Sequence, residues 1–120
     1  MGRNQRKGAS FEQDCADYIS ARIGDEIIRK TKHGKNDEGD LHGIKFMGKR
    51  VTAECKNKRR MELSEWVDEA EIERGNDDGD YGIVIHKRKG RGAKSFGENY
   101  VTMTLDTFLA MSVGGSDLLY

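Results

Sequence analysis

Residues 81–86, with the sequence Tyr-Gly-Ile-Val-Ile-His, predict the most hydrophobic strand of this chain, and such a strand belongs at the centre of a sheet. This strand constrains the fold because the chain has 120 residues, of which 35% are hydrophobic and another 35% are charged. A chain of this length and composition can build one domain around a modest core. We therefore expect a single domain over residues 1–120, with a flexible basic arm at 1–8 and a C-terminal tail at 113–120.

Apolar spacing and turn residues predict the other elements of secondary structure. Ser10 and Gln13 fit a capping box at the start of the first helix, and Gly75 is a plausible end for the second. A turn at Gly48-Lys49 joins two short strands. The order α-β-β-β-α-β-β-α predicts an α/β fold in which helices flank a mixed sheet. The expected helices span 10–23, 62–74 and 105–111, the strands span 26–31, 41–47, 51–56, 81–86 and 100–105, and the loops span 32–39 and 87–97.

The charges of the chain are segregated along the sequence. The 21 basic and 21 acidic residues give a formal net charge of zero, which taken as a whole argues against a protein that binds polyanions. However, residues 1–60 carry 15 basic and 9 acidic side chains, whereas residues 61–80 carry 1 and 9, and residues 81–120 carry 5 and 3. The helix expected over 62–74 has Trp66 and Ala70 on its apolar face and nearly all of its acidic residues on the opposite face. This asymmetry predicts that one side of the protein binds nucleic acid.

Several other classes of protein are excluded by what the sequence lacks. No run approaches the about 20 apolar residues that are needed to span a bilayer. The basic N-terminus is not followed by the apolar segment of a secretory signal. Cys15 and Cys55 form neither a disulfide framework nor a Cys-x-x-Cys motif, which fits a reducing compartment. We therefore expect a cytoplasmic protein.

The residues that carry chemistry are Asp40 and, after thirteen intervening residues, Glu54-Cys55-Lys56. Side chains alternate along a strand, so Glu54 and Lys56 project together while Cys55 projects toward the core. Folding back at the turn brings Asp40 opposite Lys56 or within two residues of it. Two carboxylates and an ammonium group then converge, an arrangement that suits Mg²⁺-assisted phosphodiester cleavage. The alternative is that Glu54 and Lys56 form a charge pair on a solvated strand.

This pattern resembles the PD-(D/E)XK nuclease superfamily, with Gly39-Asp40 in place of Pro-Asp and residues 54–56 as the (D/E)XK element. More narrowly, it resembles the archaeal-type Holliday junction resolvases and their phage relatives. Those proteins carry the same Glu-Cys-Lys triplet and open with a Lys-Gly-x-x-Phe-Glu element, which is found here at residues 7–12. The resemblance covers residues 7 to about 105. The missing proline is expected to cost only the stiffness of the turn.

The resemblance implies a restriction-endonuclease-like fold of phage or prokaryotic origin and a DNA endonuclease that depends on Mg²⁺, for which Mn²⁺ substitutes. The substrate would be a four-way junction, and its two symmetric nicks imply a homodimer. The rival interpretations are another nicking, repair or restriction endonuclease on this fold and a non-catalytic nucleic-acid-binding module. The implied catalytic residues are Glu12, Asp40, Glu54 and Lys56, and the implied metal ligands are Asp40, Glu54 and the backbone carbonyl of Cys55.

Some assignments stay open on the sequence alone. Glu12 also suits the dipole of a helix start. Asp37 and Glu38 are close enough in sequence to Asp40 to share the metal role. The resolvases use a small hydroxyl residue before the motif aspartate, for which Thr31 is the candidate, and His33 lies in the same loop.

Two basic clusters, 56–60 and 87–94, lie beside the ends of predicted strands. Lysine and arginine there would hold DNA phosphates without reading the sequence, although a run of charges is often no more than a solvated face. Trp66 is expected to be a core or dimer residue rather than one that stacks on bases. The expected DNA-binding residues are Arg3, Arg6, Lys7, Lys32, Lys35, Lys58, Arg59, Arg60, Lys87, Arg88, Lys89 and Arg91.

Overall fold

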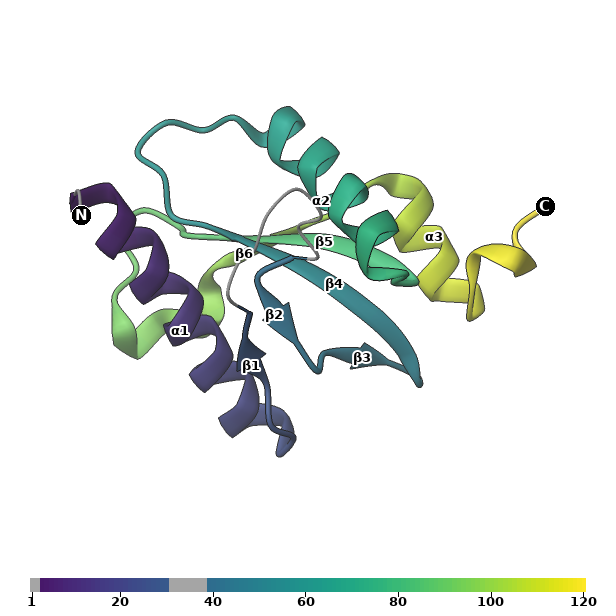
Figure 1. The fold of residues 1–120 in the computed structure, drawn as a ribbon, viewed down its shortest axis with the longest axis horizontal. Helices are drawn as coiled ribbons and strands as arrows, with labels where there is room; N and C mark the ends of the chain where they lie inside the picture. The colour runs from purple at the N-terminus through teal and green to yellow at the C-terminus, as the bar shows by residue number, and fades with distance from the viewer. Residues whose placement is uncertain (1–2, 31–38) are drawn as a thin grey trace.

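The computed structural model describes residues 3–30 and 39–120, with side chains from Ser10 onward. The predicted α/β class is confirmed, because the described residues form a mixed sheet of six strands flanked by helices (Figure 1). The strand order is β1-β2-β4-β5-β6, and β3 pairs with β4 outside this path. The elements are α1 (Arg3–Ile23), β1 (Ile28–Arg29), β2 (Leu41–His42), β3 (Lys45–Phe46), β4 (Lys49–Lys56), α2 (Leu63–Asp77), β5 (Tyr81–His86), η1 (Ala93–Glu98), β6 (Tyr100–Thr102), α3 (Leu105–Val113) and η2 (Ser116–Leu118).

The parallel pair β4 and β5 forms the centre of the sheet. Every residue of β5 is buried, so the strand predicted at 81–86 is confirmed in both its bounds and its internal position. The register pairs Glu54 with Val84 and Lys56 with His86. Helix α2 connects the two strands and lies on one side of the sheet, and α1 lies on the other (Figure 1).

A bulge divides the strand that was predicted at 41–47 into β2 and β3, which adds one strand to the predicted order. Leu41 pairs with Ala53 and Lys45 pairs with Arg50, so one extra residue lies on the β2–β3 side. Gly43 permits the bulge with a φ of 111°, and a Cβ there would lie 2.8 Å from the carbonyl oxygen of Glu26.

The turn that follows the bulge lies one residue earlier than predicted. Its central residues are Met47 and Gly48, with φ of 51° and 82°, the pattern of a type I′ hairpin turn. The prediction had placed the turn at Gly48-Lys49, whereas Lys49 is the first residue of β4. The strand predicted at 26–31 shortens to Ile28–Arg29.

Helix α1 begins at Arg3, so the predicted start and capping box at Ser10 are wrong. Residues 3–8, expected as a flexible arm, lie within this helix. Arginine, glutamine and lysine are good helix formers, and they extend the helix toward its N-terminus without a cap at Ser10. The predicted end is confirmed, since Gly24 follows the helix with a φ of 80°.

Helix α2 differs from its prediction in length and in the side that its acidic residues face. It continues through Gly75 to Asp77 and ends where Asp78 adopts a left-handed φ of 54°. Glu73 and Asp77 are buried on the same face as Trp66, so the acid is not confined to the outer face. These carboxylates are accommodated because the face of β4 that they meet is polar. For example, Asp77 accepts a hydrogen bond of 2.9 Å from the Thr52 hydroxyl.

The core has two parts, one on each side of the sheet. Val51, Ala53 and Cys55 of β4 pack with α1 in the larger cluster, which confirms the predicted alternation along this strand. The smaller cluster joins Trp66 and Ala70 of α2 to Val84. The polar side chains of β4 therefore lie beneath α2, and this position creates the candidate site.

The C-terminal elements follow the prediction with shifted bounds. The strand predicted at 100–105 ends at Thr102, because the side chain of Thr104 caps α3 by accepting a hydrogen bond from the Thr107 N–H. Helix α3 runs on to Val113, the loop predicted at 87–97 contains much of η1, and the tail contains η2. None of the described helices combines the length and the apolar character that a membrane span requires.

Candidate metal and phosphate site

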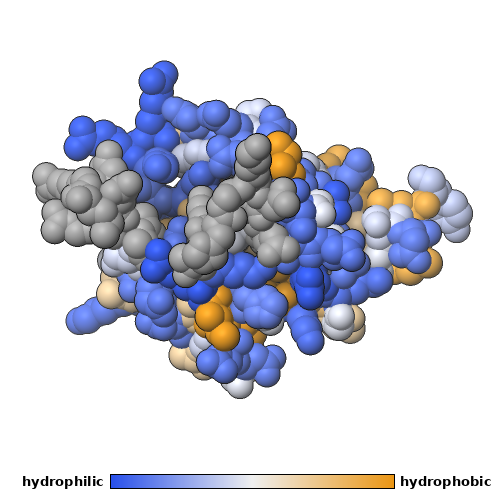
Figure 2. All heavy atoms as spheres, in the orientation of Figure 1, coloured by the Kyte–Doolittle hydropathy of each residue, from blue (hydrophilic) through white to orange (hydrophobic). Residues whose placement is uncertain are grey.

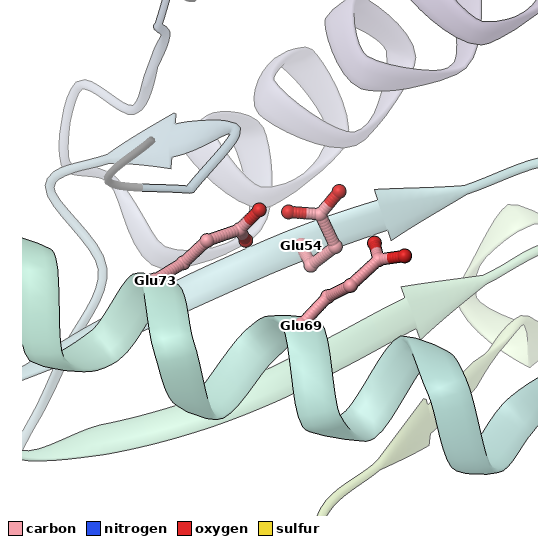
Figure 3. Close-up of side chains that lie close together, drawn as sticks. All are labelled: Glu54, Glu69 and Glu73. Atoms are coloured by element: carbon pink, nitrogen blue, oxygen red, sulfur yellow. The ribbon is translucent and has the colours of Figure 1, made fainter. Parts of the chain in front are cut away.

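A cluster of three carboxylates lies between β4 and α2. Glu54 is 1% exposed on β4, and Glu69 and Glu73 are one turn apart on the facing helix. One carboxylate oxygen from each residue lies within 4.8 Å of the others. Figure 3 shows the three side chains pointing toward one another. We call Glu54, Glu69 and Glu73 the carboxylate cluster.

Lys56 bridges two members of the carboxylate cluster. Its Nζ lies 2.8 Å from Oε2 of Glu69 and 3.4 Å from Oε1 of Glu54, and its side chain is 13% exposed. Burial lowers the pKa of Lys56, but the hydrogen bond to Glu69 and the charge of Glu54 outweigh it, so the pKa is raised. The group is therefore a protonated ammonium at neutral pH. The charge pair between Glu54 and Lys56 that the alternative interpretation expected is present, but both side chains are enclosed, so the strand that carries them is not solvated.

Asp40 lies next to this site at the start of β2. It is 1% exposed, and its Oδ2 accepts a hydrogen bond of 2.7 Å from the backbone N–H of Cys55. The pairing of Leu41 with Ala53 puts Asp40 opposite Glu54, two residues from Lys56 and within the predicted range. The structure thus brings these residues to one part of the sheet, although Asp40 does not belong to the carboxylate cluster.

Gly39 gives the backbone before Asp40 a conformation that proline cannot adopt. Its φ is 95°, whereas the proline ring fixes φ near −65°. A Cβ at this position would lie 2.9 Å from Cγ2 of Thr52. The expectation that the missing proline costs only stiffness is therefore wrong, because this chain approaches Asp40 along a different backbone path.

Glu12 is outside the carboxylate cluster and pairs with a cation. Its Oε2 lies 2.7 Å from Nε of Arg29 on β1, and its side chain is 16% exposed. The alternative interpretation, stabilisation of a helix start, does not hold, because α1 begins nine residues earlier at Arg3.

Cys55 turns its side chain away from the carboxylate cluster and toward Cys15 of α1. The contact with Cys15, burial, and the charges of Asp40 and Glu12 raise the pKa of the Cys55 thiol. The thiol is thus protonated and inward-facing, which leaves the backbone as the part of Cys55 that is available to a ligand.

Lys56 also lines a basic cavity of about 390 Å³. Two aromatic side chains, Trp66 and Tyr100, also line this cavity. The guanidinium carbon of Arg88 lies 5.3 Å from the centre of the Tyr100 ring. Six of the twelve predicted DNA-binding residues line this cavity, namely Lys58, Arg59, Lys87, Arg88, Lys89 and Arg91. We call this space the basic cavity. It adjoins the carboxylate cluster because Lys56 lines the cavity and also contacts Glu54 and Glu69.

The remaining residues that the sequence singled out are partly within and partly outside the described residues. Arg60 is exposed and does not line the basic cavity. Trp66 is 4% exposed and packs in the core, which confirms that prediction. Arg3, Arg6 and Lys7 lie on the first turns of α1, and their side chains are outside the described residues, as are Thr31, Lys32, His33, Lys35, Asp37 and Glu38.

Sequence reasoning missed Glu69 and Glu73, because acidic residues were assigned to the outer face of α2. A signal was available: they lie three and seven residues after Trp66, on the same helical stripe as Ala70. The polar residues predicted for one face of β4 also needed polar partners, and a helix packed on that face had to supply them.

Comparisons with protein-family models, with curated proteins and with solved structures found no match for this chain. What it does must therefore be argued from the geometry of the site and from the motif resemblance.

Proposed function

We propose that the chain is a Mg²⁺-dependent DNA endonuclease, and more narrowly a Holliday junction resolvase that makes paired symmetric nicks in four-way junctions. One observation carries the proposal: the buried Glu54 contacts the ammonium group of Lys56, which lines a cavity of cations, and Asp40 lies opposite Glu54 in the register of the sheet. Carboxylates suit a hard divalent cation and the cavity suits DNA phosphates, so their junction suits phosphodiester hydrolysis.

The donor set at the site fits Mg²⁺ or Mn²⁺. Oε2 of Glu54 is buried and has no hydrogen-bond partner among the described residues, and it belongs to a group of closely spaced carboxylates. Glu54 would hold the ion with Asp40 and the Cys55 carbonyl, the ligands that the resemblance implies, and Glu69 or Glu73 offers a further oxygen. When bound, the ion acidifies a water molecule and offsets negative charge on the phosphate.

Lys56 has the charge and the position for a catalytic role. Its ammonium group lies both in contact with Glu54 and on the wall of the basic cavity. A scissile phosphate held in that cavity would meet this group, which would orient the attacking water or stabilise the charge of the transition state.

The basic cavity supplies the contact with the DNA backbone. Its lysines and arginines bind phosphates irrespective of sequence, so affinity should fall steeply with salt. Acidic residues on the outer side of α2 discourage DNA from approaching there. In the proposed setting the enzyme acts as a homodimer in the cytoplasm, consistent with its two free, buried cysteines.

The test separates binding from cutting with Asp40→Asn and Lys56→Ala. Each variant should lower the rate of Mg²⁺-dependent junction cleavage by at least about 100-fold. Binding of a labelled junction in fluorescence anisotropy should change by only a few fold, since the other six cations of the basic cavity remain. Lys45→Ala removes an exposed lysine of β3 as the matched control and should leave both measurements unchanged. Cleavage by Lys56→Ala at the wild-type rate would contradict the proposal.

A further inference from the structure

The outward side of α3 is apolar and uncovered. Leu105, Phe108, Leu109 and Val113 recur at the spacing of one helical stripe and are 71%, 58%, 39% and 48% exposed. The opposite side of the helix packs on the domain through the buried Ala110. We call these four exposed residues the α3 face. Helix α3 is therefore apolar on two sides, of which only the side that carries Ala110 is buried.

The α3 face lies in a region where exposed apolar residues gather and charges are scarce. Of the fifteen large hydrophobic residues that are exposed in the described chain, nine lie within residues 100–120. The same segment holds only two charged residues, Asp106 and Asp117, in a chain that is 35% charged. Figure 2 shows hydrophobic side chains at the end of the molecule formed by the C-terminal segment. Depletion of charge with retention of large apolar side chains is the composition of an interface core.

We propose that the α3 face is the interface through which two copies of this chain form a two-fold symmetric dimer. With Asp106 as the one charged residue of α3, this surface carries no pattern of charges that demands a partner of opposite charge, and an apolar stripe can pack against its own copy across a two-fold axis. This inference rests on the proposed function in one respect, since paired nicks require two catalytic sites in one assembly.

The exposed area is also of the right size for a dimer. The α3 face exposes roughly 320–430 Å² of apolar side chain, taking ~150–200 Å² for each fully exposed residue. A standard interface buries about 800 Å² on each partner, of which about 65% is apolar in homodimers. The α3 face therefore supplies more than half of the apolar share of such an interface.

The proposed interface is close to the basic cavity in the chain. Strand β6 immediately precedes α3, and Tyr100 of β6 lines that cavity. Strand β6 is also at the edge of the sheet. Dimerisation through α3 would hold two basic cavities within one assembly.

The experiment measures mass in solution by sedimentation equilibrium, without DNA or metal. Wild type should have twice the chain mass of 13.5 kDa, and the double variant Leu105→Glu, Phe108→Glu should have the mass of one chain with an unchanged circular dichroism spectrum. Ile72→Glu on α2 is the matched control, because Ile72 is 66% exposed, and it should remain a dimer. A second double variant, Leu105→Ser, Phe108→Ser, gives the same comparison if the glutamates prevent folding.

The outcomes distinguish the interface from the proposed activity. A wild-type protein that has the mass of one chain at 100 µM overturns the interface, whatever other partner binds the α3 face, and so does a double variant that stays dimeric. Dissociation of the Ile72→Glu control to the same extent would likewise overturn it. A dimeric wild type that never cleaves DNA leaves the interface standing and refutes the nuclease instead. If both proposals hold, the monomeric variant should lose paired cuts while single nicks persist.

Discussion

Replacement of Asp40 should separate its part in folding from its part in catalysis. Its Oδ2 accepts the backbone N–H of Cys55 at 2.7 Å, in a position that is 1% exposed. Asp40→Ala leaves that buried N–H without its acceptor, whereas Asp40→Asn keeps an oxygen at the same place. Both variants lose the carboxylate that the proposed reaction uses.

The size of the effect follows from the hydrogen bond. An unsatisfied buried donor costs about 1–3 kcal/mol, and the amide variant loses only the ionic share of the bond, about 1 kcal/mol. The entropy of unfolding of a 120-residue chain is about 0.25 kcal/mol per kelvin, so Asp40→Ala should lower Tm by roughly 4–12 °C. Asp40→Asn should lower it by no more than about 4 °C.

The assay is thermal and urea unfolding in EDTA, which excludes metal, followed by junction cleavage in Mg²⁺. Asp68→Ala on the exposed side of α2 is the control and should shift the free energy of unfolding by less than about 0.5 kcal/mol. If Asp40→Ala is as stable as wild type, or if the two Asp40 variants are equally destabilised, the hydrogen bond to Cys55 does not hold β2 against β4 and the reasoning fails.

Two further predictions concern the backbone and a buried histidine. Gly39→Ala should destabilise the protein by about 1–3 kcal/mol and impair cleavage, because the new Cβ would contact Thr52. Gly48→Ala is the control: its φ is similar and no atom lies within 4 Å of the new Cβ, so it measures the free-energy cost of the left-handed backbone conformation alone. Equal losses of urea stability in the two variants would show that the contact is unimportant. Burial lowers the pKa of His86, so the unfolded chain takes up the proton first. The contribution of His86 to the free energy of unfolding is complete above the unfolded pKa of about 6.5 and is lost as pH falls through the folded pKa. Urea titrations from pH 7.5 to 5 should therefore show a shallower decline in the free energy of unfolding for His86→Gln than for wild type. An identical decline in the two proteins would show that His86 does not cause the loss of stability at low pH.

The sequence predicts well those parts of the fold in which the local pattern of apolar and polar residues matches their burial. Strand β5 is apolar throughout and buried throughout, so its bounds could be predicted to the residue. Strand β4 alternates, and its two faces correctly separate the core side from the side of Glu54 and Lys56. The register that puts Asp40 opposite Glu54 follows from the turn that joins two neighbouring strands, and a shift of the turn by one residue keeps Asp40 within the predicted range.

The remaining features depend on tertiary contacts that a local pattern does not contain. Amphipathic patterning predicts that the acidic side chains of a helix face solvent. Glu73 and Asp77 of α2 are nevertheless buried, because the face of β4 beneath them is polar. The bulge at Gly43 depends on the close approach of the Glu26 carbonyl, a contact across the sheet. The pairing of Glu12 with Arg29 likewise joins a helix to a strand.

We propose that Asp40, Glu54 and Lys56 form a metal-dependent nuclease site. The most direct measurement incubates wild-type protein with a four-way junction labelled on each strand in turn, with Mg²⁺ or with EDTA, beside a matched linear duplex. We expect paired symmetric cuts in the junction that require Mg²⁺ and are absent from the duplex. Equal cutting of both substrates would contradict the junction specificity, and binding without any cleavage in Mg²⁺ or Mn²⁺ would contradict the enzyme itself.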